Sequence, residues 1–219
     1  MAVQPAYEAW VKGDPKTSTL GDCPFCHRVL LTLEEKEVPY TKGYIDLYAD
    51  KPAWLFEVNE KGSVPVVKDL ETQEWLIDSA DIVDHLEQKH PEPGLGTSKD
   101  IPEAGSKVFP AFVQYLKSSG AEEGEKREAL LKELDLLNSH LEQHGPFLKG
   151  QDISAGDLAL APKLYHLTVA LKAFKDFTVP ERFTAVTSYL AAVQGRQSWK
   201  NTHYSEELVL KGWKAHLQG

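Results

Sequence analysis

Both cysteines of the chain, Cys23 and Cys26, lie in the stretch GDCPFCHR, residues 21–28. A C-x-x-C pair followed by a histidine fits three kinds of chemistry: haem attachment, half of a zinc site, or a reactive thiolate. Haem needs an axial ligand opposite His27, and the one methionine in the sequence is Met1. Structural zinc needs four ligands, and no second C-x-x-C or H-x-x-x-H pair follows at a spacing that zinc motifs use. The pattern favours a reactive thiol, and we expect no metal site.

The position of Cys23 supports this interpretation. Pro24 prefers the first turn of a helix, which places Cys23 at the N-cap or first residue, beside backbone N–H groups without helical partners. The partial positive charge there stabilises a thiolate. At helix starts of this kind, thiol pKa values fall from about 8.5 to about 3.5–7.5. We predict a redox-active or nucleophilic Cys23; the alternative is a pair of small buried thiols that only pack.

Cys26 differs from Cys23 because it lies one turn inside the helix, where the helix dipole acts more weakly. Its neighbours Phe25 and Val29 indicate apolar surroundings. It could resolve an oxidised Cys23 by forming a disulfide, or it could simply fill space behind the nucleophile. The sequence leaves both possibilities open.

The elements around the thiols are mixed in type over residues 1–90. Hydrophobic periodicity and turn residues predict the order β-α-β-α-β-β-α, which suits a thioredoxin-like domain. The predicted strands are 7–11, 38–46, 64–67 and 74–77, and the predicted helices are 28–36, 52–58 and 80–89.

A second group of residues could complete a thiol site. In a thioredoxin-like domain, a cis Val64–Pro65 bond would turn the Val64 backbone toward the thiolate, where an extended peptide could add as a strand. Asp78 and Ser79, at a helix start, offer a hydroxyl, amides and the helix dipole to a carboxylate. Lys51 could pair with another carboxylate. A small acidic thiol peptide such as glutathione fits, although a plain N-cap and a solvated lysine would also explain these residues.

The sequence pattern predicts helices for the rest of the chain. Residues 91–105 are rich in proline and glycine and are predicted to be a linker, followed by an all-helical domain over 106–219. Ser154 and Asp157 predict a capping box at one helix start. Leucines at 4-3-4 spacing predict a core-facing stripe, consisting of Leu130, Leu134, Leu137 and Leu141.

Composition limits the possible partners. The chain has 33 acidic and 24 basic residues, a net charge of -9, which argues against nucleic acid or a stable association with an anionic membrane. No apolar run reaches the roughly 20 residues that span a bilayer, and the first residues lack the features of a secretory signal. Two cysteines predict a reducing compartment, with a cytoplasmic location as the default. An organelle copy without its transit segment would look the same.

Several stretches together resemble the plant-type dehydroascorbate reductases, a branch of the glutathione transferase superfamily. They are LGDCPFCHRVLLTLEEKEVPY, KGSVPVV, DSADIV, HGPFLKG and SAGDLALAPKLYHL, and the likeness runs from about Trp10 to Trp213. The resemblance implies an α/β thioredoxin-like N-terminal domain plus an all-α C-terminal domain. It also implies a monomeric enzyme that reduces dehydroascorbate to ascorbate, with glutathione as co-substrate and no tightly bound cofactor.

The resemblance also assigns roles to residues. Cys23 corresponds to the nucleophile, Asp22 to a dehydroascorbate contact, and Lys12 to a basic residue near thiolate and substrate. Cys26 occupies a position that is Ser or Cys in the family, which implies a dispensable thiol, and His27 departs from the usual Gln. The remaining matches are glutathione contacts at Lys51, Val64, Asp78 and Ser79, and positions near the substrate pocket at His166 and Trp213.

Two other functions use the same fold. A glutaredoxin-like or omega-type thioltransferase would use Cys23 on protein–glutathione mixed disulfides. A chloride-intracellular-channel-like protein would insert its N-terminal segment into membranes without catalysis. The charged residues around the first helix disfavour insertion: Asp22, His27, Arg28, Glu34, Glu35 and Lys36.

Overall fold

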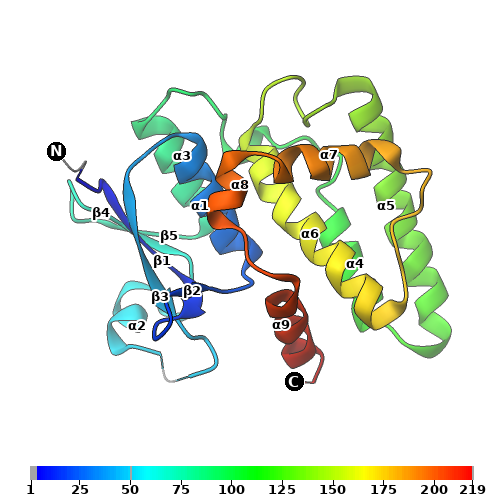
Figure 1. Ribbon diagram of the computed structural model, residues 1–219, viewed down its shortest axis with the longest axis horizontal. Coiled ribbons are helices and arrows are strands. Elements are labelled where there is room, and N and C mark those ends of the chain that lie inside the picture. Colours follow the sequence, from blue (N-terminus) through cyan, green and yellow to red (C-terminus); the bar gives the residue numbers. More distant parts are fainter. Residues whose placement is uncertain (1–3, 50, 219) are drawn as a thin grey trace. The chain divides into compact units, whose positions relative to one another are not determined.

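The computed structural model describes residues 4–49 and 51–218, and Figure 1 shows their helices and strands. The chain divides into two compact units. Unit 1 consists of the residues up to Lys99 together with Gln197–Tyr204, and unit 2 consists of Asp100–Arg196 and the residues from Ser205 onward. The division lies inside the predicted 91–105 linker, but residues 197–204, which the sequence pattern assigned to the helical domain, belong to unit 1.

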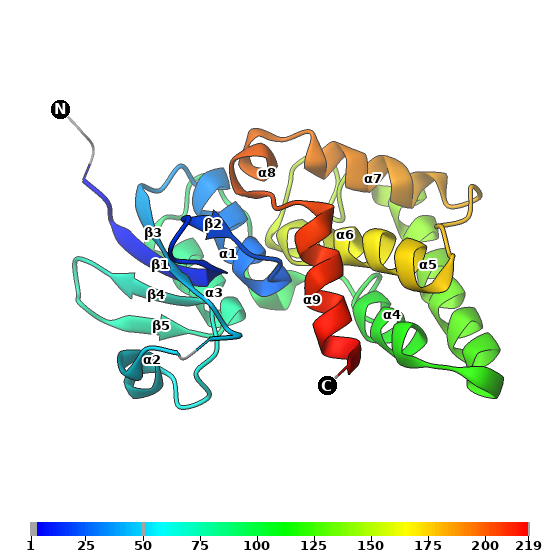
Figure 2. The same ribbon diagram turned by 60° about the horizontal axis from the view of Figure 1, so that its bottom comes forward.

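Unit 1 is built on a mixed five-stranded sheet (Figure 2). β1 runs parallel to β3 and antiparallel to β4, and β4 pairs with β5 in the antiparallel sense. Alternate residues of β1 are buried, as its pattern predicted. The strands are β1 Tyr7–Asp14, β2 Thr19–Leu20, β3 Tyr40–Ile45, β4 Val66–Asp69 and β5 Trp75–Ile77.

Helices cover both faces of this sheet. α1 (Pro24–Glu35) and α3 (Ser79–Lys89) bury Val29, Leu30, Leu33, Ile82 and Leu86 against one face. α2 (Ala53–Val58) buries Leu55 against the other. The helices predicted over 28–36, 52–58 and 80–89 are therefore present and cover the sheet, and unit 1 has the predicted thioredoxin-like fold.

One helix of unit 1 comes from a distant part of the sequence. α8 (Gln197–Thr202) packs on α1. His27 of α1 is fully buried there, with Nε2 3.1 Å from the hydroxyl of Thr202 and its ring 4.4 Å from that of Trp199. The Thr202 hydroxyl donates to the carbonyl of Ser198, so it accepts from His27, which places a proton on Nε2. His27 thus anchors α8 to α1.

Unit 2 is helical, as predicted. The leucine stripe of α5 is buried. The capping box is present: the Asp157 carboxylate accepts from the backbone N–H of Ser154 at 2.8 Å and from its hydroxyl at 2.6 Å. The main helices of this unit are α4 Val108–Lys117, α5 Glu123–His144, α6 Ala155–Lys175, α7 Thr184–Gln194 and α9 Glu206–Gln218. A short 3-10 turn lies at Gly120–Glu122 in this unit, and another, Ser98–Asp100, lies where the chain passes from unit 1 to unit 2.

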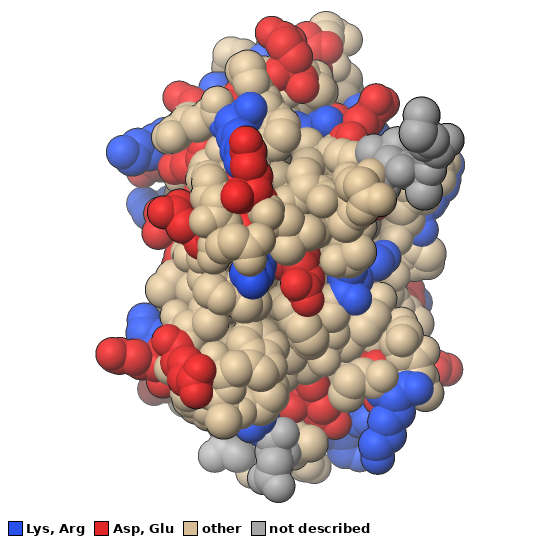
Figure 3. Space-filling model, turned by 90° about the vertical axis from the view of Figure 1, so that its left-hand side faces the viewer, with Lys and Arg blue, Asp and Glu red and all other residues tan. Residues whose placement is uncertain are grey.

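The surface shown in Figure 3 carries acidic and basic side chains interspersed with uncharged ones. On this face the basic side chains are scattered, whereas a nucleic-acid-binding surface would gather them into a patch. Among the helices that the structure describes, none combines the length and the apolar character needed to cross a bilayer.

Candidate active site

Cys23 is the N-cap residue of α1, and Pro24 occupies the first turn, as predicted. Its backbone is extended (φ -95°, ψ 112°), and its sulfur accepts a hydrogen bond from the amide of Cys26, with N and Sγ 3.3 Å apart. The side chain therefore takes the place of the capping oxygen at the positive end of the helix dipole. This is the geometry that stabilises a thiolate.

The pKa of the Cys23 thiol is lowered from its ordinary value, chiefly because the Cys26 thiol donates a hydrogen bond to the Cys23 sulfur. Burial acts in the opposite direction. The amides of Cys26 and Phe25 and the charge of Lys12 add to the lowering. The predicted helix start indicated the amides and the family resemblance implied the lysine, but nothing in the sequence indicated that the second thiol would be the strongest influence.

Cys26 is fully buried and is not joined to Cys23 in a disulfide. Burial, and then the neighbouring Cys23 sulfur, raise its pKa well above the ordinary value. The backbone N–H of Lys12 lies 3.5 Å from the Cys26 sulfur. A thiol that stays protonated beside one that ionises is placed to serve as its hydrogen-bond donor.

Lys12 supplies the positive charge of the site. Its Nζ lies 2.6 Å from Oδ1 of Asp22, the residue before the nucleophile. Burial opposes ionisation of the ammonium, but the hydrogen bond that the ammonium donates to Asp22, together with the charge of Asp22, outweighs burial and the pKa of Lys12 is raised. Gly21 brings this segment beside β1, since its amide donates to the Lys12 carbonyl at 2.8 Å and a Cβ there would lie 3.0 Å from that oxygen.

Tyr48 is a site residue that the sequence did not reveal. Lys12 Nζ donates to its hydroxyl at 3.1 Å and lies 4.8 Å from the centre of its ring. Tyr48 lies just beyond the end of β3, where its amide donates to Oδ1 of Asp46 at 2.9 Å. Because β1 and β3 are parallel, their carboxyl ends meet at one edge of the sheet. That topology brings Lys12 and Tyr48 together, and no local motif signals it.

The candidate glutathione residues all lie in unit 1. Asp78, at φ 68°, is the N-cap of α3 and accepts from the amide of Ala80 at 2.8 Å, while Ser79 is the first helical residue. The Val64–Pro65 bond is cis, and Val64 packs on the same hydrophobic cluster as Cys23. Lys51 Nζ donates to the carbonyl of Gly62 at 2.8 Å.

His166 and Trp213 lie in unit 2 and contact each other. The indole N–H of Trp213 donates to Nδ1 of His166 at 3.0 Å, and both side chains are buried. Phe112 packs edge-on against Trp213, with ring centres 5.1 Å apart. The pair joins α6 to α9. The two residues are 47 positions apart, and no motif in the sequence predicts their contact.

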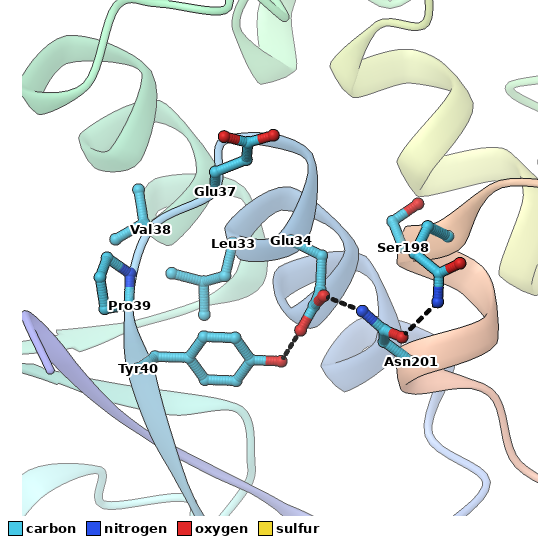
Figure 4. Close-up of a pocket in the computed structure, with 9 residues that line it drawn as sticks. Leu33, Glu34, Glu37, Val38, Pro39, Tyr40, Ser198 and Asn201 are labelled. Atoms are coloured by element: carbon cyan, nitrogen blue, oxygen red, sulfur yellow. Dashed lines mark hydrogen bonds between the residues drawn. The ribbon is translucent and has the colours of Figure 1, made fainter. Parts of the chain in front are cut away.

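A pocket of about 470 Å³ lies at the opposite end of α1 from Cys23. Figure 4 shows the Glu34 carboxylate between the Tyr40 hydroxyl and the Asn201 amide, which donate to it at 2.7 and 2.6 Å. The pocket is therefore separate from the thiol site. Elsewhere in the described part of the chain, no group of His, Cys, Asp and Glu side chains is arranged to hold a metal ion.

Comparison with known proteins gives consistent matches. The glutathione S-transferase N-terminal domain matches residues 22–89, and the C-terminal domain of the same family matches residues 101–192. Glutathione S-transferase DHAR2 of Arabidopsis thaliana is 49% identical, over 90% of this chain and 92% of the relative. A probable cytosolic glutathione S-transferase DHAR1 of rice, Oryza sativa, is 47% identical, over 89% and 90%. The crystal structure of Chlamydomonas reinhardtii dehydroascorbate reductase superposes with a TM-score of 0.89 at 45% identity, over 96% of this chain and 98% of that one.

Proposed function

This chain belongs to the glutathione S-transferase family, in its dehydroascorbate reductase branch, and we propose that Cys23 is its catalytic nucleophile in the glutathione-dependent reduction of dehydroascorbate to ascorbate. The observation that carries the proposal is the Cys23 sulfur at the start of α1, with its pKa lowered and the charged Lys12 nearby. A thiolate in that position can act without a metal ion or a tightly bound cofactor.

In the first stage, the Cys23 thiolate attacks a ring carbonyl of dehydroascorbate. A sulfur–carbon bond forms and the π electron pair moves to the carbonyl oxygen, where Lys12 stabilises the negative charge. Water then attacks the sulfur, and the sulfur–carbon bond breaks with its electrons left on the ring. The hydroxyl of water stays on sulfur as a sulfenic acid, and its proton leaves with the ascorbate monoanion. Asp22 holds Lys12 in place and contacts the substrate.

In the second stage, two glutathione molecules restore the enzyme. The first thiol condenses with the sulfenic acid, releasing water and leaving glutathione joined to Cys23 in a mixed disulfide. The second attacks that disulfide, so that glutathione disulfide and the Cys23 thiolate are released. Two thiols are thereby oxidised for each dehydroascorbate reduced, and the two stages give ping-pong kinetics.

The substrate contacts follow the family resemblance and the local geometry. Ser79 and the first amides of α3 would bind a glutathione carboxylate, as helix starts bind anions. Lys51 would bind the other carboxylate, and the Val64 backbone would pair with the peptide. For His166 and Trp213, the resemblance alone implies positions near the pocket of the second substrate; within unit 2 the indole bond holds the imidazole in one orientation.

For Cys26, the structure favours a supporting role over catalysis. Its buried, protonated thiol donates to Cys23, and a disulfide between the two would be a side branch of the cycle. We further propose that the enzyme acts in a reducing compartment such as the cytosol, and that it acts as a monomer. Elution at the size of one chain across a range of protein concentrations would support the monomer.

The experiment that tests the function is steady-state ascorbate formation from dehydroascorbate and glutathione by three proteins. Wild type should turn over with parallel double-reciprocal plots, Cys26→Ser should retain most of that rate, and Cys23→Ser should be inactive. Appreciable turnover by Cys23→Ser would show that Cys23 is not the catalytic nucleophile. A wild-type kcat/KM higher on a glutathionylated peptide than on dehydroascorbate would point instead to the thioltransferase reaction.

A further inference from the structure

Lys12, at the centre of the thiol site, has more hydrogen-bonding capacity than Asp22 uses. A lysine ammonium has three N–H donors. One is directed at Asp22 (2.6 Å) and one at the Tyr48 hydroxyl (3.1 Å), and among the described residues the third has no acceptor. Two different side chains therefore hold the cation beside Cys23.

These two side chains differ in what they can offer an incoming anion. Asp22 as a carboxylate can only accept hydrogen bonds, whereas a phenol both accepts and donates. Since the Tyr48 oxygen accepts from Lys12, its own proton is available for another acceptor. Within the described part of the chain, Lys12 is the one hydrogen-bond partner of that hydroxyl, and Tyr48 is 59% exposed.

We propose that Tyr48 contacts the oxidised substrate and donates a hydrogen bond to the oxygen on which negative charge develops. This role rests on the proposed function. When the thiolate adds to one of the adjacent carbonyls, the ring gains charge on oxygen, and the departing enediolate has two oxygens on neighbouring carbons. Lys12 and Tyr48 present two donors side by side, which matches that pair of oxygens.

The ring of Tyr48 has a separate function from its hydroxyl. The Lys12 ammonium lies 4.8 Å from the ring centre, so the aromatic face helps to hold the cation. Replacing Tyr48 by phenylalanine retains that contact and removes only the hydroxyl. The exposed side chain makes a loss of folding unexpected for this variant. Tyr48→Phe also removes the hydrogen bond from Lys12, so the pH profile of Cys23 alkylation must be measured beside the kinetics to separate the two effects.

The matched control is Tyr44→Phe. Tyr44 lies in β3 and packs against the core of unit 1, and burial raises the pKa of its hydroxyl. Tyr44→Phe removes a hydroxyl in the same way, from a neighbouring part of the chain. Among the described residues, Tyr44 makes no hydrogen bond to Lys12. We expect its kinetics to equal those of wild type.

The experiment measures kcat/KM separately for dehydroascorbate and for glutathione, because each reports its own stage of a ping-pong cycle. We expect Tyr48→Phe to lower the value for dehydroascorbate roughly fivefold to tenfold, the effect of losing one hydrogen bond. The value for glutathione and the pH profile of Cys23 alkylation by iodoacetamide should not change.

Two results would overturn the proposal. Unchanged kinetics would show that the hydroxyl does not touch the substrate. A loss in either stage that is accompanied by a shifted alkylation profile would show that Tyr48 acts only through Lys12 and the thiolate. A wild-type protein inert toward dehydroascorbate is a different result, since it contradicts the proposed function itself and this role with it.

Discussion

The amide nitrogen of Cys26 lies 3.3 Å from the sulfur of Cys23, and a hydrogen bond from the Cys26 thiol is the largest influence that lowers the pKa of Cys23. Both donors come from a residue three positions further along, which the first turn of α1 brings beneath the N-cap. The C-x-x-C spacing thus works here as a capping arrangement with an additional S–H donor. It gives Cys26 a function in the reduced enzyme that does not require a disulfide.

Removing the Cys26 donor should raise the pKa of Cys23 toward its ordinary value. Because only the thiolate reacts, the profile of alkylation by iodoacetamide should move to higher pH in Cys26→Ala, with the rate at pH 6 reduced about tenfold. Cys26→Ser retains a hydroxyl donor, so its alkylation profile should lie between those of wild type and Cys26→Ala. If Cys26→Ala alkylates with the wild-type profile, the thiol does not act as the donor.

Replacing Lys12 should impair the first stage of catalysis more than the second. Lys12→Gln removes the charge that stabilises both the thiolate and the developing substrate anion, so kcat/KM for dehydroascorbate should fall roughly 10–100-fold. The exposed Lys16, in the turn after β1, provides the control Lys16→Gln, which should retain full activity. A Lys12→Gln enzyme with wild-type kcat/KM would remove Lys12 from the mechanism.

Ser79 should matter for glutathione and little for stability. Asp78, and not Ser79, supplies the N-cap hydrogen bond of α3, so Ser79→Ala leaves that cap intact. We expect kcat/KM for glutathione to fall about tenfold, with the thermal unfolding midpoint and the dehydroascorbate value unchanged. Ser106→Ala, at an exposed position in unit 2, is the control. An unchanged glutathione value would limit Ser79 to a structural role.

Asp69 should make the stability of unit 1 sensitive to acid. Burial of its carboxylate opposes ionisation, but hydrogen bonds from Lys89 and from two turn amides outweigh burial and lower the pKa of Asp69 to about 2. The unfolded value is about 3.9. Because the folded pKa is the lower one, the stabilisation is present above about pH 4 and is lost as the pH falls toward 2. It amounts to roughly 2–3 kcal/mol.

Urea unfolding at several pH values measures this contribution. Asp69→Asn should lower the free energy of unfolding at pH 7 by about that amount and should flatten its decline between pH 4 and 2. Asp152→Asn, at an exposed position, should leave both unchanged. A variant as stable as wild type at pH 7 would show that the contacts of Asp69 with Lys89 and with the turn amides contribute little.

The sequence predicted those parts of the site that depend on near neighbours. Pro24 placed Cys23 at the helix start, and Asp78 beside Ser79 marked the start of α3. The parts it missed depend on residues distant along the chain. His27 meets Thr202 across 175 residues, and Lys12 meets Tyr48 because two parallel strands end together. Neither contact has a periodicity or motif, since only the completed packing creates it.

The second thiol shows another limit of the sequence. Its spacing indicated equally a resolving cysteine or a packing residue, because the pattern does not specify protonation. The structure distinguishes the two thiols by their environments: Cys26 is fully enclosed, whereas Cys23 lies at the open end of the helix, where amides and Lys12 favour the anion. Burial raises the pKa of Cys26, whereas the hydrogen bonds at the helix start outweigh burial and lower the pKa of Cys23, and composition and spacing encode neither environment.

Single-turnover chemistry without glutathione tests the central role of Cys23 most directly. Reduced protein is mixed with excess dehydroascorbate, and ascorbate is measured together with the mass of the protein. The mechanism predicts about one ascorbate released for each protein chain, with oxidation confined to Cys23 or to its bond with Cys26, and none from Cys23→Ser. Ascorbate appearing only after glutathione is added would contradict a reaction that begins at this sulfur.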